Sequence, residues 1–134
     1  MSNPTTEDAK LFLKIIDLMI KSKGFRDAFE WIFAELKEKT FEKFIEKYPI
    51  GSEGYENILT VGNFGEMIGT LVNRDLLNED LAFDYMGDFL WDRIGPIIRG
   101  MRKKFGRPRF LENYEVWVSK YPEWAEKNPP KLET

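Results

Sequence analysis

The most regular set of potentially reactive side chains is a run of four carboxylates at four-residue intervals, Asp80, Asp84, Asp88 and Asp92. Residues at this spacing share one face of a helix. Carboxylate oxygens suit hard cations such as Mg²⁺, Mn²⁺ or Ca²⁺, so one hypothesis is a hard-metal carboxylate enzyme in which Glu66 completes the ligand set. One helix cannot enclose an ion alone. We therefore favour a solvated acidic face that suits a helix N-terminus and pairs with arginines of another helix or subunit.

The sequence contains no histidine and no cysteine. It therefore lacks the usual general base, the thiol nucleophile and the ligands of soft metals. Di-metal helical bundles also draw on histidine. We expect no catalytic residue, no bound metal and no cofactor, and we lean towards a protein that is not an enzyme.

A basic segment, residues 99–109, follows the acidic run and carries six cations within eleven residues. They are Arg99, Arg102, Lys103, Lys104, Arg107 and Arg109. Three interpretations fit: the cations complement the C-terminal end of a helix, they pair with the acidic run of a partner subunit, or they bind phosphate groups of nucleic acid, nucleotide or lipid. The net charge of −3 argues against a general nucleic-acid binder.

Gly62, Gly65 and Gly69 form a strip along one side of a predicted helix over residues 53–76. Each glycine costs about 1 kcal/mol relative to alanine inside a helix, so the strip needs compensation. We expect a close crossing by another helix, with the first or fourth helix as the candidates. A ligand groove along the strip and an interrupted helix are the alternatives.

Two large side chains of the predicted fourth helix, residues 79–105, stand on unexpected faces. Arg93 lies on the apolar side, where a buried charge needs a carboxylate, and Glu66 is the candidate partner. The alternative is an arginine whose stem packs while its head reaches water. Trp91 lies with the aspartates on the polar side, so it is shielded by the chain termini or marks an association surface.

The predicted first helix begins at Thr5 or Thr6, with Asp8 completing a capping box, and ends at Gly24. Its apolar residues cover more than half of the helical wheel: Leu11, Phe12, Ile15, Ile16, Leu18, Met19 and Ile20. So wide an apolar face predicts contact with two neighbouring helices or with a second subunit.

The rest of the chain up to residue 121 is also predicted to be helical. Hydrophobic periodicity predicts helical structure over residues 25–48, with a break near Thr40 where the apolar face changes phase. Asn78 caps the fourth helix, Pro96 kinks or splits it at Ile94, and Gly106 ends it. A fifth helix covers residues 110–121. We therefore predict an all-α, compact single-domain bundle of five to six helices over residues 1–121, and an extended or frayed tail over residues 122–134.

Composition is that of a globular domain, with 43% hydrophobic and 32% charged residues. Charged residues interrupt every apolar stretch, so no membrane span is expected, and the N-terminus lacks the basic region of a signal peptide. The absence of cysteine fits a reducing cytoplasm.

Three stretches resemble a known family: NFGEMIG at residues 63–69, LLNEDL at 76–81 and WDRIGPIIRGMR at 91–102. Together they resemble the prokaryotic domain-of-unknown-function family 4760 over roughly residues 55–118. The resemblance implies a helical domain without an assigned activity. It nominates Glu66, Trp91, Arg99 and Arg102 as family-pattern positions.

These observations predict a non-catalytic interaction or regulatory module that self-associates through its first helix, as a homo-oligomer or with a protein partner. The alternative is binding of a phosphate ligand or nucleic acid through the basic segment, with Arg99, Arg102, Lys103, Arg107 and Arg109 as candidate binding residues. The third hypothesis is the hard-metal carboxylate enzyme.

Overall fold

The structure is a computed structural model that describes residues 3–133, in which eight α-helices and no strands are found. The helices are α1 (Thr6–Lys21), α2 (Lys23–Ala34), α3 (Phe41–Lys47), α4 (Glu53–Asn73), α5 (Glu79–Met86), α6 (Trp91–Lys104), α7 (Glu112–Val118) and α8 (Tyr121–Lys127). The predicted all-helical fold is confirmed, but five to six helices was too low a number. No helix within residues 3–133 combines the length and hydrophobicity that crossing a bilayer requires.

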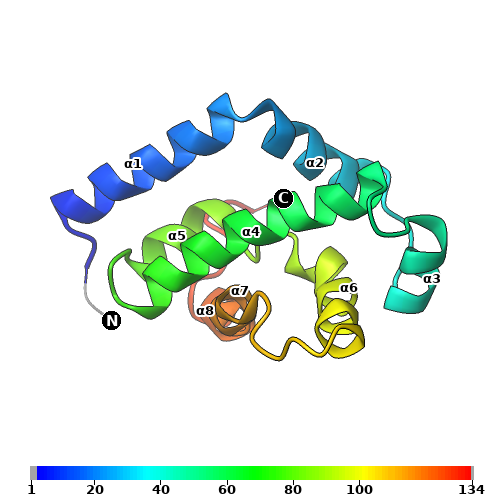
Figure 1. Ribbon diagram of the computed structural model, residues 1–134. Coiled ribbons are helices and arrows are strands. Elements are labelled where there is room, and N and C mark those ends of the chain that lie inside the picture. The colour runs from blue at the N-terminus through cyan, green and yellow to red at the C-terminus, as the bar shows by residue number, and fades with distance from the viewer. Residues whose placement is uncertain (1–2, 134) are drawn as a thin grey trace.

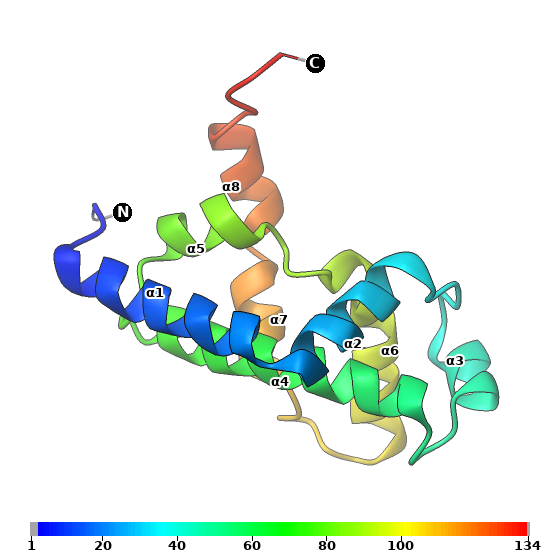
Figure 2. The ribbon, with the colours of Figure 1, turned by 90° about the horizontal axis from the view of Figure 1, so that it is seen from above.

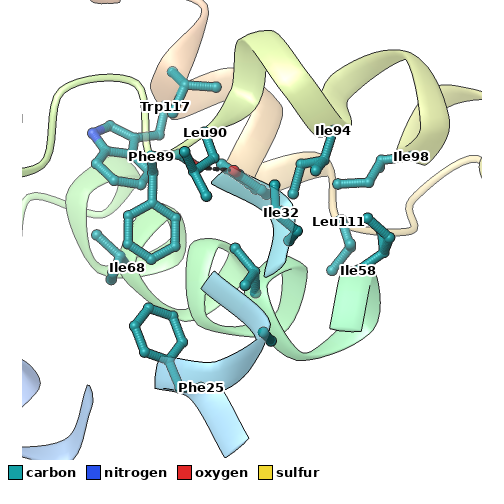
Figure 3. Close-up of a cluster of buried hydrophobic side chains, with 14 of the residues drawn as sticks. Phe25, Ile32, Ile58, Ile68, Phe89, Leu90, Ile94, Ile98, Leu111 and Trp117 are labelled. Atoms are coloured by element: carbon teal, nitrogen blue, oxygen red, sulfur yellow. Dashed lines mark hydrogen bonds between the residues drawn. The ribbon is translucent and has the colours of Figure 1, made fainter. Parts of the chain in front are cut away.

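The longest helix, α4, runs through the middle of the molecule (Figure 1). In that view α1 and α2 lie on one side of α4, and α6, α7 and α8 lie on the other. The most extensive packing of α4 is with α7, followed by α2. Figure 3 shows the core between these layers, where Ile58 and Ile68 of α4 meet Ile32 of α2 and Trp117 of α7, each of them fully buried.

The N-terminal helix pair is joined through one serine. Thr5 and Asp8 form the predicted capping box, since the Asp8 backbone N–H donates to the Thr5 hydroxyl and the Asp8 carboxylate accepts from the Thr5 N–H. Ser22 ends α1 and caps α2, accepting from the Phe25 backbone N–H at 3.0 Å. Gly24 therefore lies inside α2, and the prediction that Gly24 ends the first helix is wrong because the serine side chain starts the next helix first.

The predicted break near Thr40 is confirmed. Helix α2 ends at Ala34, and α3 begins at Phe41 after Thr40, whose side chain accepts from the Lys43 backbone N–H at 3.2 Å. The change of direction lets Phe41 pack against α6 at Gly100, where any Cβ would overlap the Phe41 side chain.

The fourth predicted helix is split, but the predicted break at Ile94 is in the wrong place. The chain leaves the helix at Gly87, whose φ of 58° favours glycine, and Phe89 and Leu90 also take left-handed conformations before α6 starts at Trp91. Pro96 then lies in the second turn of α6, where its missing N–H removes one hydrogen bond near the helix start. As predicted, Asn78 caps α5 and Gly106, with φ of 60°, follows the end of α6.

An extended or frayed tail was predicted for residues 122–134. That prediction is wrong for residues 122–127, which belong to α8. The Trp124 side chain anchors this helix to α5: its indole N–H donates to Asp80 at 2.6 Å, and its ring lies 5.7 Å from that of Phe83. Figure 2 shows α8 beside α5, and Lys131 in the segment after α8 pairs with Asp84 of α5 at 3.0 Å. Tertiary contacts thus stabilise a helix too short to form alone.

Candidate functional site

The acidic run is divided by the break between α5 and α6. Asp80 accepts from the Trp124 indole, Asp84 accepts from the Lys131 ammonium at 3.0 Å, and Asp88 accepts from the Asp92 backbone N–H at 3.2 Å. Within residues 3–133 no group of three or more acidic side chains gathers in a way that could hold a metal ion. The run instead fastens α8 and the C-terminal segment to α5 and shapes the start of α6.

Two groups near this break have shifted pKa values. Burial raises the pKa of Asp88 above that of an ordinary carboxyl, and the charge of Asp92 adds to the shift. Burial also raises the pKa of Tyr114 well above its usual range, with further contributions from Asp88 and Asp92. The high pKa keeps the Tyr114 hydroxyl protonated, and this hydroxyl donates a hydrogen bond to the Phe89 carbonyl. The bond attaches the segment between α5 and α6, where Phe89 and Leu90 have left-handed conformations, to α7.

Two arginines of the basic segment are bound to one carboxylate of α7. Arg99 Nε donates to Glu115 Oε2 at 2.8 Å, and Arg102 Nη1 donates to Glu115 Oε1 at 2.7 Å. Arg102 also donates through Nε to the Phe110 carbonyl at 3.0 Å. Burial alone would raise the pKa of Glu115, but the hydrogen bonds and charges of the two arginines outweigh it and lower that pKa. Arg99 and Arg102 therefore join α6 to α7.

The remaining cations of the segment point to solvent. Arg109 pairs with Glu112 at 2.9 Å, while Lys103, Lys104 and Arg107 form no ion pair with residues 3–133. Glu115 was not predicted from the sequence, because pairing rules within one helix do not reach the next helix. A usable signal was present: Arg99 and Arg102, three residues apart, place two cations on the same side of one helix.

The glycine strip faces α7, which is neither of the two helices expected to cross it. A Cβ at position 62 would lie 2.6 Å from the Leu111 side chain, and one at position 65 would lie 2.6 Å from the Tyr114 ring. A Cβ at position 69 would overlap the backbone carbonyl of Asn113. The strip is therefore a close helix crossing, and α7 fills the space that a ligand groove along it would need.

Glu66, beside the strip, caps α7 instead of pairing with Arg93. Its carboxylate accepts from the Tyr114 backbone N–H and from the Asn113 side-chain amide, each at 3.0 Å. The residue at the N-cap position of α7, Leu111, has no polar side chain for this task. A carboxylate at a helix N-terminus is also favoured by the helix dipole. Glu66 thus positions the helix that carries Glu115.

Arg93 is exposed, and its guanidinium lies over the Phe33 ring at 5.1 Å from the centroid. The prediction of an Arg93–Glu66 pair is wrong, and the arrangement matches the alternative in which the head of Arg93 reaches water. Trp91 is half-buried within the domain: its ring lies 4.8 Å from that of Tyr114, and Gly95 leaves room for it. The contacts of Trp91 within residues 3–133 are thus with α6 and α7.

Among residues 3–133, helix α1 carries more exposed large apolar side chains than any other helix. Leu13, Leu18 and Ile20 expose 65%, 55% and 61% of their surface, whereas Phe12, Ile15 and Met19 are buried. Leu13, Ile16 and Ile20 follow one another at intervals of three and four residues, so they form one edge of the apolar side. The apolar face of α1 is therefore wider than the surface that the neighbouring helices cover.

A shallow groove of about 250 Å³ continues this edge of α1 onto α2 and α5. Ile16 and Ile20 line one wall, Phe29 lies on α2, and Tyr85 and Met86 line the α5 side. Tyr85 is 65% exposed and lies edge-on to Phe12 at 5.4 Å. Tyr85 was not identified from the sequence, where α5 was expected to continue into α6. We call Leu13, Ile16, Ile20 and Tyr85 the α1 surface.

The family of the chain follows from comparison with known families. The model of the domain of unknown function DUF4760 matches residues 4–121. The chain belongs to the DUF4760 family. The match begins before α1 and ends in α8, so the DUF4760 domain here includes the α1 surface as well as the stretches that carried the resemblance. No curated protein and no solved structure matches the chain.

Proposed function

We propose that this DUF4760 protein is a non-catalytic interaction module that self-associates through the α1 surface. The observation that carries the proposal is the exposure of Leu13 and Ile20 on a helix whose apolar residues Phe12, Ile15 and Met19 are already buried. Apolar side chains gathered on one surface lower their free energy by leaving water, at roughly 25 cal/mol per Å² of area buried. The lack of cysteine supports a cytoplasmic location for the module.

We favour a second copy of the chain as the partner that covers the α1 surface. Most homodimers use the same surface on both subunits, and the edge formed by Leu13, Ile16 and Ile20 is long enough to pack against its own copy. Asp17 and Lys21, on the neighbouring side of α1, already pair with each other at 2.9 Å. The contact would therefore be mainly apolar and weakly dependent on salt.

The oligomeric state tests this proposal. We expect sedimentation velocity of the full chain to show concentration-dependent dimers, and the Leu13→Ser/Ile20→Ser variant to remain monomeric because both apolar contacts are lost. Leu132→Ser is the matched control, since Leu132 is 80% exposed and lies in the C-terminal segment. A wild-type chain that stays monomeric at millimolar concentration contradicts the proposal.

Phosphate or nucleic-acid binding through the basic segment ranks below self-association. Arg99, Arg102 and Arg109 would have to leave Glu115 and Glu112 to bind phosphate. Lys103, Lys104 and Arg107 are the cations that a phosphate group meets first. The hard-metal carboxylate enzyme ranks third, because the acidic run that motivated it is divided between two helices.

A further inference from the structure

A second groove lies at the N-terminal end of α4. It has a volume of about 460 Å³ and lies where the start of α4 meets the end of α6 and the turn after it. Its apolar lining consists of Ile50, Leu59, Met101, Phe105 and Phe110. Ile50 and Phe105 are 64% and 42% exposed, whereas Met101 is buried, so the groove is open to solvent along its rim and has an apolar floor.

Two polar side chains complete the lining, and both have bonding capacity to spare. Arg107 forms no ion pair with residues 3–133, and the Tyr55 hydroxyl forms no hydrogen bond with them. Burial, with a smaller contribution from Glu56, raises the pKa of Tyr55, so its hydroxyl is a hydrogen-bond donor at neutral pH. No carboxylate lines the groove, while Lys103 and Lys104 are exposed nearby on the last turn of α6.

This combination specifies the chemistry of a ligand. Binding sites for small molecules are mostly apolar with a few placed polar groups, and their volumes are roughly 300–1,000 Å³. Here the polar groups are a guanidinium, whose planar fork matches a carboxylate, and a hydroxyl donor. The apolar lining offers its contacts to a hydrocarbon chain. An anionic head attached to an aliphatic tail satisfies both parts of the groove.

We propose that this groove binds a monomeric aliphatic carboxylate of the medium-chain fatty-acid class. The tail packs against Leu59, Met101 and Phe105, and the carboxylate is bound by Arg107 and Tyr55. This site is independent of self-association, because the residues of the α1 surface do not line it.

Calorimetric titration of the full chain with decanoate, below its micelle concentration, tests the proposal. We expect saturable one-to-one binding that Arg107→Gln weakens about tenfold or more, since a charge-assisted pair is lost. Tyr55→Phe should weaken binding by a smaller factor. Arg109→Gln is the matched control, because Arg109 lies two residues away but outside the lining. Decanol, which has the same tail without the charge, should bind more weakly than decanoate.

Nuclear magnetic resonance locates the ligand. Decanoate should shift the methyl signals of Ile50, Leu59 and Met101 and leave those of Leu13 and Ile20 unchanged. Absence of saturable decanoate binding overturns the proposal, as does an equal loss in Arg107→Gln and Arg109→Gln. Binding to phosphatidylglycerol vesicles without binding of monomeric decanoate also overturns it, because the surface would then dock on a membrane.

Discussion

Helices α7 and α1 lie on opposite sides of α4 (Figure 1), yet of the two only α7 packs extensively on it. Towards α7 it presents three glycines that allow close contact and a carboxylate, Glu66, that caps the incoming helix. On α1, by contrast, Phe12 and Met19 are buried but Leu13 and Ile20 are exposed to solvent. The polar side chains of this domain therefore position α7, whereas its surplus of apolar surface lies on α1.

The four family-pattern positions illustrate this point, because each contacts α7. Glu66 caps it, Arg99 and Arg102 bind its Glu115, and Trp91 packs on its Tyr114. Residues that looked like candidates for chemistry are therefore engaged in joining α4 and α6 to one short helix. A helix of seven residues is unstable alone, so it depends on such contacts.

The largest expected effect is at the α4–α7 crossing. Gly69→Ala should lower the free energy of unfolding by about 2 kcal/mol, because the new methyl group meets backbone that cannot move aside. Gly24→Ala should instead raise it by about 0.5 kcal/mol, since that glycine lies in a helix with open space around it. Chemical denaturation measures both. Similar effects of the two substitutions would mean that α7 does not closely approach α4.

Removal of the cap should have the next largest effect. Glu66→Ala leaves the Tyr114 N–H and the Asn113 amide without their acceptor, which we expect to cost about 1.5 kcal/mol. Glu30→Ala, at an exposed position of α2, is the control and should be nearly neutral. Hydrogen exchange of the α7 amides should rise selectively in Glu66→Ala. Protection of α7 equal to that of the wild-type chain would show that Glu66 does not cap it.

A smaller effect should appear in the dependence of stability on pH. Because the pKa of Glu115 is lower in the folded state, its contribution is complete above the ordinary glutamate pKa and is lost as pH falls through the folded value. Glu115→Gln should therefore destabilise the protein at pH 7 and flatten the decline in stability below the ordinary glutamate range. Parallel stability curves for the two proteins between neutral and acidic pH would contradict the Glu115 pairing.

The smallest effect on stability should come from the α1 surface. Leu13→Ser/Ile20→Ser should change the free energy of unfolding of the monomer by less than about 0.5 kcal/mol, since both side chains are mostly exposed. Measured at a concentration where dimers are absent, this result would separate association from folding. A loss of several kcal/mol would show that α1 needs these side chains for its own packing.

Local sequence signals determined much of the secondary structure. The Thr5–Asp8 capping box, the break before Phe41, the Asn78 cap and the Gly106 stop each depend on hydrogen bonds or backbone conformations within a few residues. Failures occurred where two local signals competed. Ser22 capped a helix before Gly24 could end one, and Gly87 interrupted the fourth helix before Pro96 could kink it.

The sequence by itself determined an all-helical chain, a wide apolar face on the first helix and a glycine strip that required a close neighbour. Only the tertiary structure decided which helix became that neighbour and that part of the C-terminal segment would be helical. It also decided that Glu66 would cap α7 and that Glu115 would pair with two arginines of α6. The physical reason is range. Caps and periodicity act within one or two turns, whereas partners 13 to 48 residues apart in the chain meet only when the whole domain packs.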